Sequence, residues 1–191
     1  MSRIGHQPIT IPSGVQVTIS ADNRVDIKGG KGILSQEIDT AISVSVKDNI
    51  LQVDRSTENK RDKSLHGLYR MLLQNMVIGV TEGYKKSLEI VGVGYKAFIE
   101  NDLLELSLGK SHAIFMQMPA EVKAQVEVTK GKNPRTYIHL ESIDKQLIGQ
   151  VAARIRAEKR PEAYITKREN TQKGIRYVGE HLIGKTKKDG K

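Results

Sequence analysis

A short glycine-containing segment has the spacing that most suggests chemistry. Residues 90–97 read "IVGVGYKA", so Gly92, Gly94 and Ala97 reproduce the spacing of a dinucleotide-binding fingerprint. In that fingerprint the glycines open a helix, and the N-terminus of the helix binds a pyrophosphate. The segment would therefore indicate a nucleotide-dependent enzyme if a helix followed it.

The residues that follow the glycines are typical of strands. Residues 95–99 continue as an extended segment, Asn101-Asp102 is typical of a turn, and residues 104–108 alternate in hydrophobicity. No helix is then available to meet a phosphate, so a bulge or a close backbone approach within an antiparallel sheet explains the glycines better. Residues 28–32, "KGGKG", lack the trailing Lys-Ser/Thr of a P-loop and indicate a hairpin turn.

The remaining residues suggest no other catalytic or metal site. The chain has no Cys, and no two of its histidines stand at metal-ligand spacing. It also lacks the Ser-x-x-Lys and Gly-x-Ser-x-Gly elements of common hydrolases. We therefore expect no catalysis, no metal and no cofactor. An enzyme that uses the glycines of residues 90–97 stays as the least favoured alternative.

Charge is distributed unevenly along the 191 residues. Residues 145–191 contain 13 Lys and Arg against 5 Asp and Glu, whereas residues 1–144 contain 18 against 17. An excess confined to the last quarter indicates a polyanionic partner, nucleic acid first; a solubilising tail is the alternative. No apolar run approaches the roughly 20 residues that span a bilayer, and the first residues lack the apolar core of a secretory signal. We expect a cytosolic protein.

The end of the chain mixes cations with aromatic residues. Tyr164 and Tyr177 stand among Lys and Arg, a composition typical of RNA binding, in which cations contact phosphates and planar groups stack on bases. Packing of both rings against the protein is the alternative. Because this segment is rich in Gly and charge, we expect it to serve binding more than folding. The candidate RNA-binding residues are Lys145, Arg154, Arg156, Lys159, Arg160, Tyr164, Lys173, Arg176, Tyr177, Lys185, Lys187, Lys188 and Lys191.

The two halves of the chain repeat one succession of elements. Alternating segments that predict strands fill residues 15–53, and a helix of about four turns follows, with Leu65, Leu68, Leu72 and Met76 on its apolar face. Residues 84–142 again predict strands, and residues 144–160 predict a helix that ends before Pro161. On that second helix, Arg154 and Arg156 point to different faces because they are two residues apart.

The repeat extends to individual positions. Residues 25–31, "VDIKGGK", align with residues 104–110, "LELSLGK", and Gly67 aligns with Gly149. The sequence therefore predicts an α+β protein with two tandem copies of a small antiparallel-sheet-plus-helix domain, residues 1–82 and 83–160. A basic RNA-binding extension, residues 161–191, follows the second copy. Since only 4% of residues are aromatic, we expect two small aliphatic cores.

Several segments, in order along nearly the whole chain, resemble one family. They are "MSRIGHQPITIPSGV" at the start, "HGLYRMLLQNMVIGVTEGY" at residues 66–84, "VGVGYKA" at residues 91–97, and "PEAYITKRENTQKGIRYVGE" at residues 161–180. They resemble the bacterial form of the large-subunit ribosomal protein L-six family. The resemblance implies two similar α+β domains without enzymatic activity, which bind 23S rRNA mainly through the second domain and the tail.

The resemblance also implies a setting and partners. The family lies in the large ribosomal subunit near the stalk base, the sarcin-ricin loop and the subunit interface. The expected partners are 23S rRNA and neighbouring large-subunit proteins, including those of the stalk base, with translational GTPases nearby. No membrane and no small-molecule substrate are expected, and the location is the ribosome in the cytoplasm. The alternative is a free-standing RNA- or DNA-binding protein with a basic tail.

This chain departs from the family pattern in its tail. Eight residues, 165–172, separate Tyr164 from the segment "KGIRY", where the family usually has two. The longer interval adds Lys167 and Arg168 as candidate RNA contacts. Residues 108–112 resemble a turn of the family's second domain, which makes Ser111 and His112 further, weaker candidates.

Overall fold

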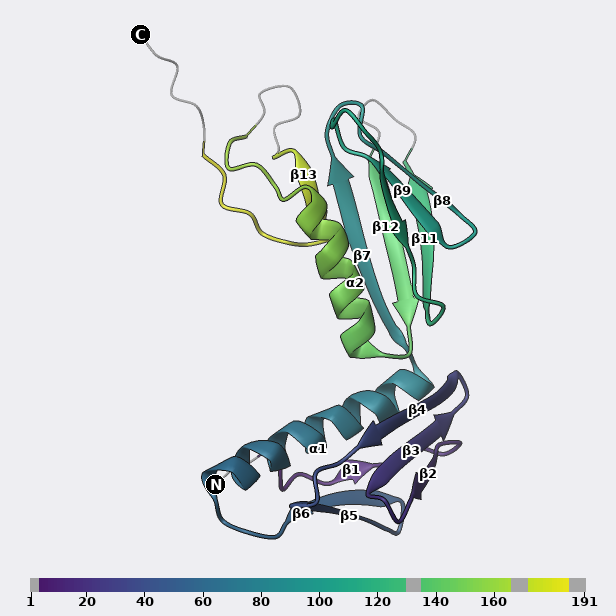
Figure 1. Cartoon of the computed structure of the whole chain (residues 1–191), viewed down its shortest axis with the longest axis vertical. Coiled ribbons are helices and arrows are strands. Elements are labelled where there is room, and N and C mark those ends of the chain that lie inside the picture. Colours follow the sequence, from purple (N-terminus) through teal and green to yellow (C-terminus); the bar gives the residue numbers. More distant parts are fainter. Residues whose placement is uncertain (1–3, 130–134, 166–171, 186–191) are drawn as a thin grey trace. The chain divides into compact units, whose positions relative to one another are not determined.

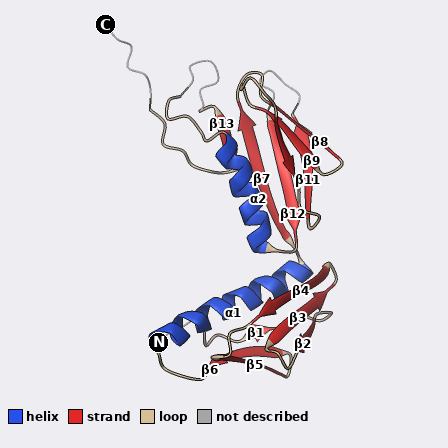
Figure 2. Cartoon of the chain, in the orientation of Figure 1, coloured by secondary structure: helices blue, strands red, loops and turns tan. Residues whose placement is uncertain are grey.

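The chain forms two compact units, each with one helix beside antiparallel sheets (Figures 1 and 2). A computed structural model describes residues 4–129, 135–165 and 172–185. Unit 1 holds the chain up to Tyr84 together with Ile143–Lys145, and unit 2 holds Lys85–Ser142 and the residues from Gln146 onward. No helix in the described ranges is long and apolar enough to cross a membrane.

Unit 1 consists of two three-stranded sheets and a long helix. The strand orders are β1-β6-β5 and β2-β3-β4, and all neighbouring strands are antiparallel. Asp48 and Asn49 join β5 to β6 with φ angles of 48° and 60°, as a two-residue hairpin loop requires. The elements are β1 (Ile9–Thr10), β2 (Gln16–Ile19), β3 (Arg24–Gly29), β4 (Gly32–Glu37), β5 (Ile42–Lys47), β6 (Ile50–Arg55) and α1 (Lys60–Thr81).

Unit 2 repeats this topology and adds one strand. Its order β7-β12-β11 corresponds to β1-β6-β5, and β8-β9-β10 corresponds to β2-β3-β4, so the predicted tandem α+β fold is confirmed. The additional strand, β13, pairs with the side of β7 that β12 leaves open. The elements are β7 (Tyr84–Val91), β8 (Lys96–Glu100), β9 (Leu103–Ser107), β10 (Ile114–Gln117), β11 (Val122–Val128), β12 (Thr136–Ser142), α2 (Lys145–Glu158) and β13 (Gly174–Tyr177).

The glycines of residues 90–97 form a turn between two sheets rather than a nucleotide site. Gly92 and Gly94 have φ angles of 154° and 79°, and the Tyr95 amide donates to the Gly92 carbonyl at 3.1 Å. A Cβ on Gly92 would lie 2.6 Å from the Tyr95 ring, so the turn requires glycine there. Strand β8 follows, as the sequence predicts, although the glycines lie between sheets and not within one.

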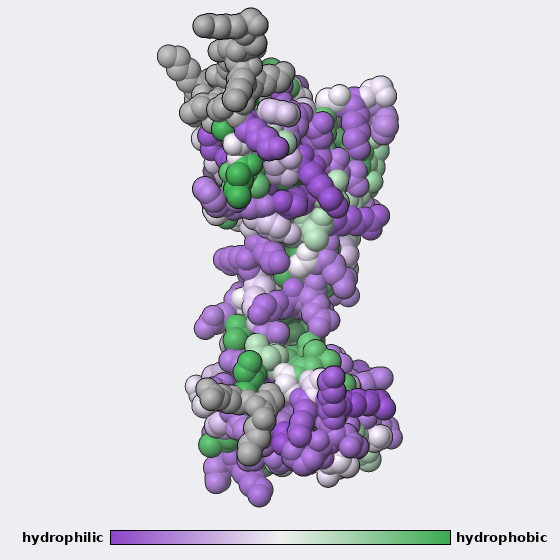
Figure 3. Space-filling view, turned by 90° about the vertical axis from the view of Figure 1, so that its left-hand side faces the viewer, coloured by the Kyte–Doolittle hydropathy of each residue, from purple (hydrophilic) through white to green (hydrophobic). Residues whose placement is uncertain are grey.

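The buried apolar residues are aliphatic in both units, as the composition predicts. No aromatic side chain is among the buried apolar residues of the described part of the chain. Figure 3 shows one face of the molecule, on which hydrophilic residues predominate and hydrophobic ones form small separate groups. The core of unit 1 includes Ile27, Ile42 and Leu51 from the strands and Leu73 and Val80 from α1.

The helix of unit 1 is longer than predicted, and its buried face is rotated. It has 22 residues, Leu68 is 50% exposed, and the buried positions include Asp62, His66 and Arg70 as well as Leu73 and Met76. The predicted apolar face is therefore wrong at Leu68, whereas Leu65 is partly buried against the core and Met76 is buried. The hydrophobic periodicity of the sequence does not indicate this face, because polar side chains occupy part of it. Burial of such side chains is costly unless they are hydrogen-bonded.

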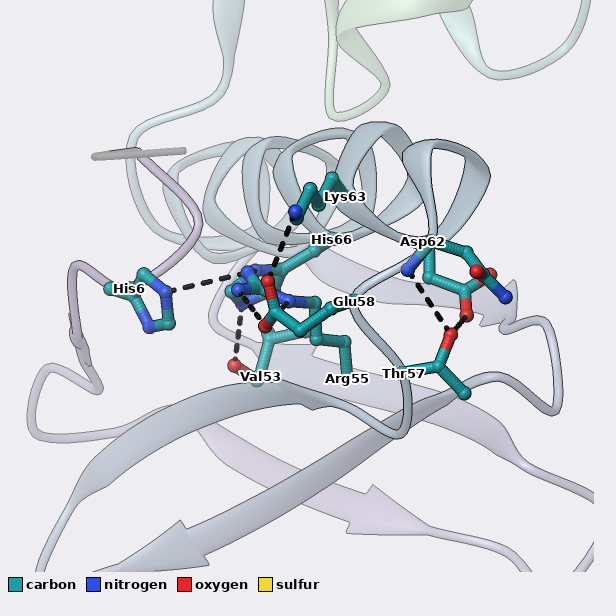
Figure 4. Close-up of polar contacts among 9 residues, drawn as sticks. His6, Val53, Arg55, Thr57, Glu58, Asp62, Lys63 and His66 are labelled. Carbon is teal, nitrogen blue, oxygen red and sulfur yellow. Dashed lines mark hydrogen bonds and ion pairs between the residues drawn. The ribbon is translucent and has the colours of Figure 1, made fainter. Parts of the chain in front are cut away.

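Those hydrogen bonds come from the end of β6 and from the segment that connects it to α1 (Figure 4), and for Arg70 from the Gln7 carbonyl. Arg55 Nη1 lies 3.1 Å from His66 Nδ1, and His66 Nε2 lies 2.8 Å from the Val53 carbonyl oxygen. Because an arginine can only donate, Nδ1 accepts and Nε2 donates, which satisfies both ring nitrogens of the fully buried His66. Arg55 Nε also donates to Glu58 at 3.0 Å, and Thr57 hydrogen-bonds Asp62.

The tail contributes to the core of unit 2, so the expectation that it serves mainly binding is wrong for its central part. Ile175 on β13 is fully buried, and Gln172 is 7% exposed. The Gln172 side-chain Nε2 donates to the Ala163 and Ile183 carbonyls, both at 3.4 Å. Residues of the "KGIRY" segment form strand β13. The sequence did not indicate this strand, because one buried isoleucine and main-chain pairing are enough to hold it and no long apolar run is needed.

Replacement of Ile175 by Ala is expected to destabilise the protein by about 2–5 kcal/mol, because the change leaves a cavity at a fully buried site. Ile183 is the matched control, since it lies in the same tail but is 89% exposed. Ile183→Ala should change the unfolding free energy by less than about 0.5 kcal/mol. Denaturant unfolding of the full chain measures both, and equal effects would contradict the structural role of β13.

Replacement of Glu58 by Gln is expected to have a pH-dependent effect on stability. Hydrogen bonds from Arg55 and then Lys63 lower the pKa of the Glu58 carboxyl to about 2. A lowered carboxyl pKa stabilises the fold above the unfolded value near 4.5, and this contribution is lost as the pH falls toward 2. Near neutral pH the melting temperature of the wild type should therefore be slightly higher than that of Glu58→Gln. The two melting temperatures should converge as the pH falls below about 4.5. Glu37→Gln, an exposed change in unit 1, is the control; a Glu58→Gln deficit constant with pH would contradict the assignment.

Candidate nucleic-acid interface

Main-chain hydrogen bonds join the end of α2 to the start of β13. The Ile175 amide donates to the Lys159 carbonyl, and the Glu162 amide donates to the Lys173 carbonyl, both at 2.8 Å. Gly174, with φ 139°, allows the close approach, because a Cβ there would lie 2.7 Å from Pro161 Cα. The fold thus brings Lys159, Arg160 and Lys173 together from segments more than a dozen residues apart.

A buried carboxylate holds two arginines on one face of the four-stranded sheet. Glu89 on β7 is 5% exposed, and it accepts from Arg176 Nε on β13 at 2.8 Å and from Arg135 Nη1 at 2.6 Å. Arg176 and Glu89 are direct partners in the strand register. The charge of Glu89 raises the pKa of the Arg135 guanidinium. Two guanidinium groups share one carboxylate, so the cluster keeps a net positive charge.

Arg156 and Tyr177 make their contacts within the protein. The Arg156 guanidinium makes two hydrogen bonds with Glu180, one of them Nε to Oε2 at 3.1 Å. These bonds lower the pKa of the Glu180 carboxyl and raise that of Arg156. The Tyr177 ring is half-buried, with Lys86 Nζ 5.7 Å and Arg156 Cζ 5.8 Å from its centre. Arg156 and Tyr177 therefore help to hold the tail on unit 2.

Tyr164 has a different environment from Tyr177. It is 50% exposed and forms a parallel β-bridge with Lys185. The Lys185 amide donates to the Ala163 carbonyl at 2.8 Å, and the Ile165 amide donates to the Lys185 carbonyl at 3.0 Å. An exposed ring and an exposed amine thus lie side by side on a fixed main chain, which suits contact with a base and a phosphate.

The other predicted residues divide into three groups. Arg154 is exposed on α2, whereas Lys145 belongs to unit 1, where it donates to Asn75 Oδ1 at 3.1 Å. Ser111 and His112 are exposed in the connection between β9 and β10, and no described contact joins them to the tail cations. The predicted residues that lie outside the described ranges are Lys167, Arg168, Lys187, Lys188 and Lys191.

Sequence reasoning missed three residues on the sheet face that carries Arg176. Arg135, the residue before β12, and Tyr137 and His139 on that strand alternate with buried residues. The Tyr137 and His139 rings stack with centres 6.2 Å apart. Arg135 and Tyr137 both contact Glu89. The alternation of polar and apolar residues from 135 to 142 is the signal that could have placed them on one face.

The histidines and carboxylates of the described residues form no candidate metal site. The described residues contain no group of three or more His, Cys, Asp or Glu placed to hold a metal ion. The His6 and His66 rings meet with centres 4.9 Å apart, but both nitrogens of His66 are used within the polar cluster. The basic surface of unit 2 is therefore the candidate nucleic-acid interface.

Comparison with known proteins identifies the family. The family model described as "Ribosomal protein L6" matches residues 11–83 and again residues 91–168. The chain is 53% identical to the large ribosomal subunit protein uL6 of Cytophaga hutchinsonii over 180 residues, 94% of each chain. It is 51% and 49% identical to the proteins of that name from Amoebophilus asiaticus and Parabacteroides distasonis, each over 188 residues and 98% of both chains. Two matches to one family model, one in each repeat, and near full-length identity of about half show that this chain belongs to the ribosomal protein L6 family.

Proposed function

We propose that this chain is a structural constituent of the large ribosomal subunit that binds and orders 23S rRNA through unit 2. Family membership supports the structural, non-enzymatic role. The observation that carries RNA binding is the arrangement of cations: unit 2 has 20 Lys and Arg against 12 Asp and Glu, and unit 1 has 11 against 10. Nucleic acid attracts such an excess through its phosphates.

The described cations of unit 2 fall into two groups: some pair with carboxylates of the protein, and others have no such partner among the described residues. Arg156 and Arg176 are bound to Glu180 and Glu89, so their main task is to hold the tail in place. Lys159 lies 3.8 Å from Glu162. The cations of the predicted set that have no carboxylate partner among the described residues of unit 2 are Arg154, Arg160, Lys173 and Lys185.

These four cations are the proposed phosphate contacts, with Tyr164 as the proposed stacking ring. The proposed setting is the neighbourhood of the stalk base, the sarcin-ricin loop and the subunit interface, among neighbouring large-subunit proteins and translational GTPases, in the cytoplasm. It rests on the family resemblance of the tail, residues 161–180. A free-standing nucleic-acid-binding role has no observation in its favour over this one.

Simultaneous replacement of Arg160 and Lys173 by Gln is expected to weaken binding of the full chain to deproteinised 23S rRNA and to flatten its salt dependence. Each phosphate contact contributes a slope of roughly 0.7–0.9 in log affinity against log salt, so loss of two should reduce the slope by about 1.4–1.8. Filter binding over a range of KCl concentrations measures the slope.

The matched control replaces Lys28 and Lys47 of unit 1 by Gln, because both are exposed and the charge lost is the same. We expect this control to keep the wild-type slope within error. Equal slopes for the two double variants would assign the effect to net charge alone. A wild-type chain that bound 23S rRNA no better than an unrelated RNA of equal length would overturn the proposed function.

Replacement of Tyr164 by Ala should lower the affinity for 23S rRNA by about 1–3 kcal/mol without changing the salt slope, because a stacked ring makes no ionic contact. Tyr164→Phe is the control and should bind nearly as well as the wild type, since it keeps the ring. Loss of affinity in both variants would assign the effect to the hydroxyl, and loss in neither would show that the exposed ring does not touch RNA.

A further inference from the structure

The chain exposes both of its phenylalanines on one sheet face of unit 2. Phe98 on β8 is 56% exposed and Phe115 on β10 is 62% exposed, and both are paired with Glu105 of β9 in the strand register. The three side chains therefore form one row across the β8-β9-β10 sheet. Leu103, 38% exposed, lies on the same face in the neighbouring row. The opposite face carries the buried Ala97, Leu104, Leu106 and Met116.

This Phe98–Phe115 face is acidic, although unit 2 as a whole is strongly basic. Strand alternation places Glu100 and Glu105 on it together with a single cation, Lys96. Neither carboxylate has a cationic partner among the described residues, unlike Glu89 and Glu180 of the same unit. The carboxylates of such a face repel phosphate. Proteins that stack bases on aromatic rings hold the nucleic-acid backbone with nearby cations, and Lys96 is the one cation beside these phenyl rings.

We propose that the Phe98–Phe115 face is a docking surface for a basic, partly apolar segment of a neighbouring protein in the large subunit. Apolar side chains of the segment would cover the two phenyl rings, and its lysine or arginine side chains would pair with Glu100 and Glu105. Aromatic residues are enriched at the centres of protein interfaces. A second copy of this chain is a poorer occupant, because it would bring the same carboxylates to the contact.

The inference rests on the proposed function in one respect, the presence of the chain in the large subunit. The two proposed surfaces bind different partners: the basic tail of unit 2 binds RNA, and the Phe98–Phe115 face binds protein. A change on the Phe98–Phe115 face should therefore leave the affinity of the free chain for 23S rRNA unaltered while it weakens retention in the assembled subunit. This separation allows the two proposals to fail independently.

The first test places the photo-reactive analogue p-benzoylphenylalanine at position 115 of the full chain, which is assembled into large subunits and irradiated. The expected product is a covalent adduct with a protein, resistant to ribonuclease, whose cross-linked peptide contains Lys or Arg beside apolar residues. An adduct with rRNA, an adduct with another copy of this chain, or no adduct at all would overturn the proposal.

The second test compares two double variants, each of which replaces two exposed apolar residues. Phe98→Ser with Phe115→Ser should lower retention of the chain in large subunits during a high-salt wash by at least about tenfold, which is the effect of losing a modest interface hot spot. Ile33→Ser with Val46→Ser removes exposed apolar residues of unit 1, 57% and 40% exposed, and should leave retention unchanged. Circular dichroism checks that both variants fold.

The outcomes of the second test separate the two proposals. Wild-type retention of the phenylalanine variant would overturn the docking surface. A lowered affinity of the free phenylalanine variant for deproteinised 23S rRNA would also overturn it, because the face would then bind RNA. Failure of the free wild-type chain to bind 23S rRNA would contradict the proposed function instead.

Discussion

The pairing of β13 with β7 is the contact on which the proposed RNA surface depends. It places Ile175 in the core and sets Arg176 beside the buried Glu89, which has a second arginine as a partner. A carboxylate buried between two guanidinium groups is costly to leave without them, so removal of the strand would leave Glu89 poorly compensated. Burial and ion pairing thus act together, and they hold the main chain of Lys159 against that of Ile175.

The two units show how one topology can carry different surfaces. In unit 1 the strand that corresponds to β7 is β1, which has two residues and no further strand beside it in the described chain. Unit 1 instead buries a few polar side chains of α1, among them His66, which accepts a hydrogen bond from Arg55. In unit 2 the same edge pairs with β13, which places Arg176 beside the buried Glu89. The one strand that unit 2 has in addition to the shared topology thus carries part of the proposed RNA surface.

Much of the fold could be predicted from the sequence, and the predictions that were wrong or missing have physical reasons. The alternating strands, the two helices and the duplication follow from local periodicity, and Asn101-Asp102 adopts the left-handed turn that those residue types favour. The buried face of α1 could not be predicted, because His66 and Arg70 become core residues only through partners distant in sequence. The strand role of Gly174–Tyr177 was missed for the same reason. Of the predicted RNA-binding residues, only the structure separates Arg156, bound to Glu180, from Arg154, which is exposed.

Amide hydrogen exchange of the free full-length chain tests the central claim most directly, because the account requires β13 to be in place before RNA binds. The amides of β13, above all that of Ile175, should be protected in the absence of RNA to about the same degree as those of β7. Binding of 23S rRNA should then change their exchange little. Exchange of the β13 amides at the rate of an unstructured peptide, with protection acquired only on addition of 23S rRNA, would contradict the account.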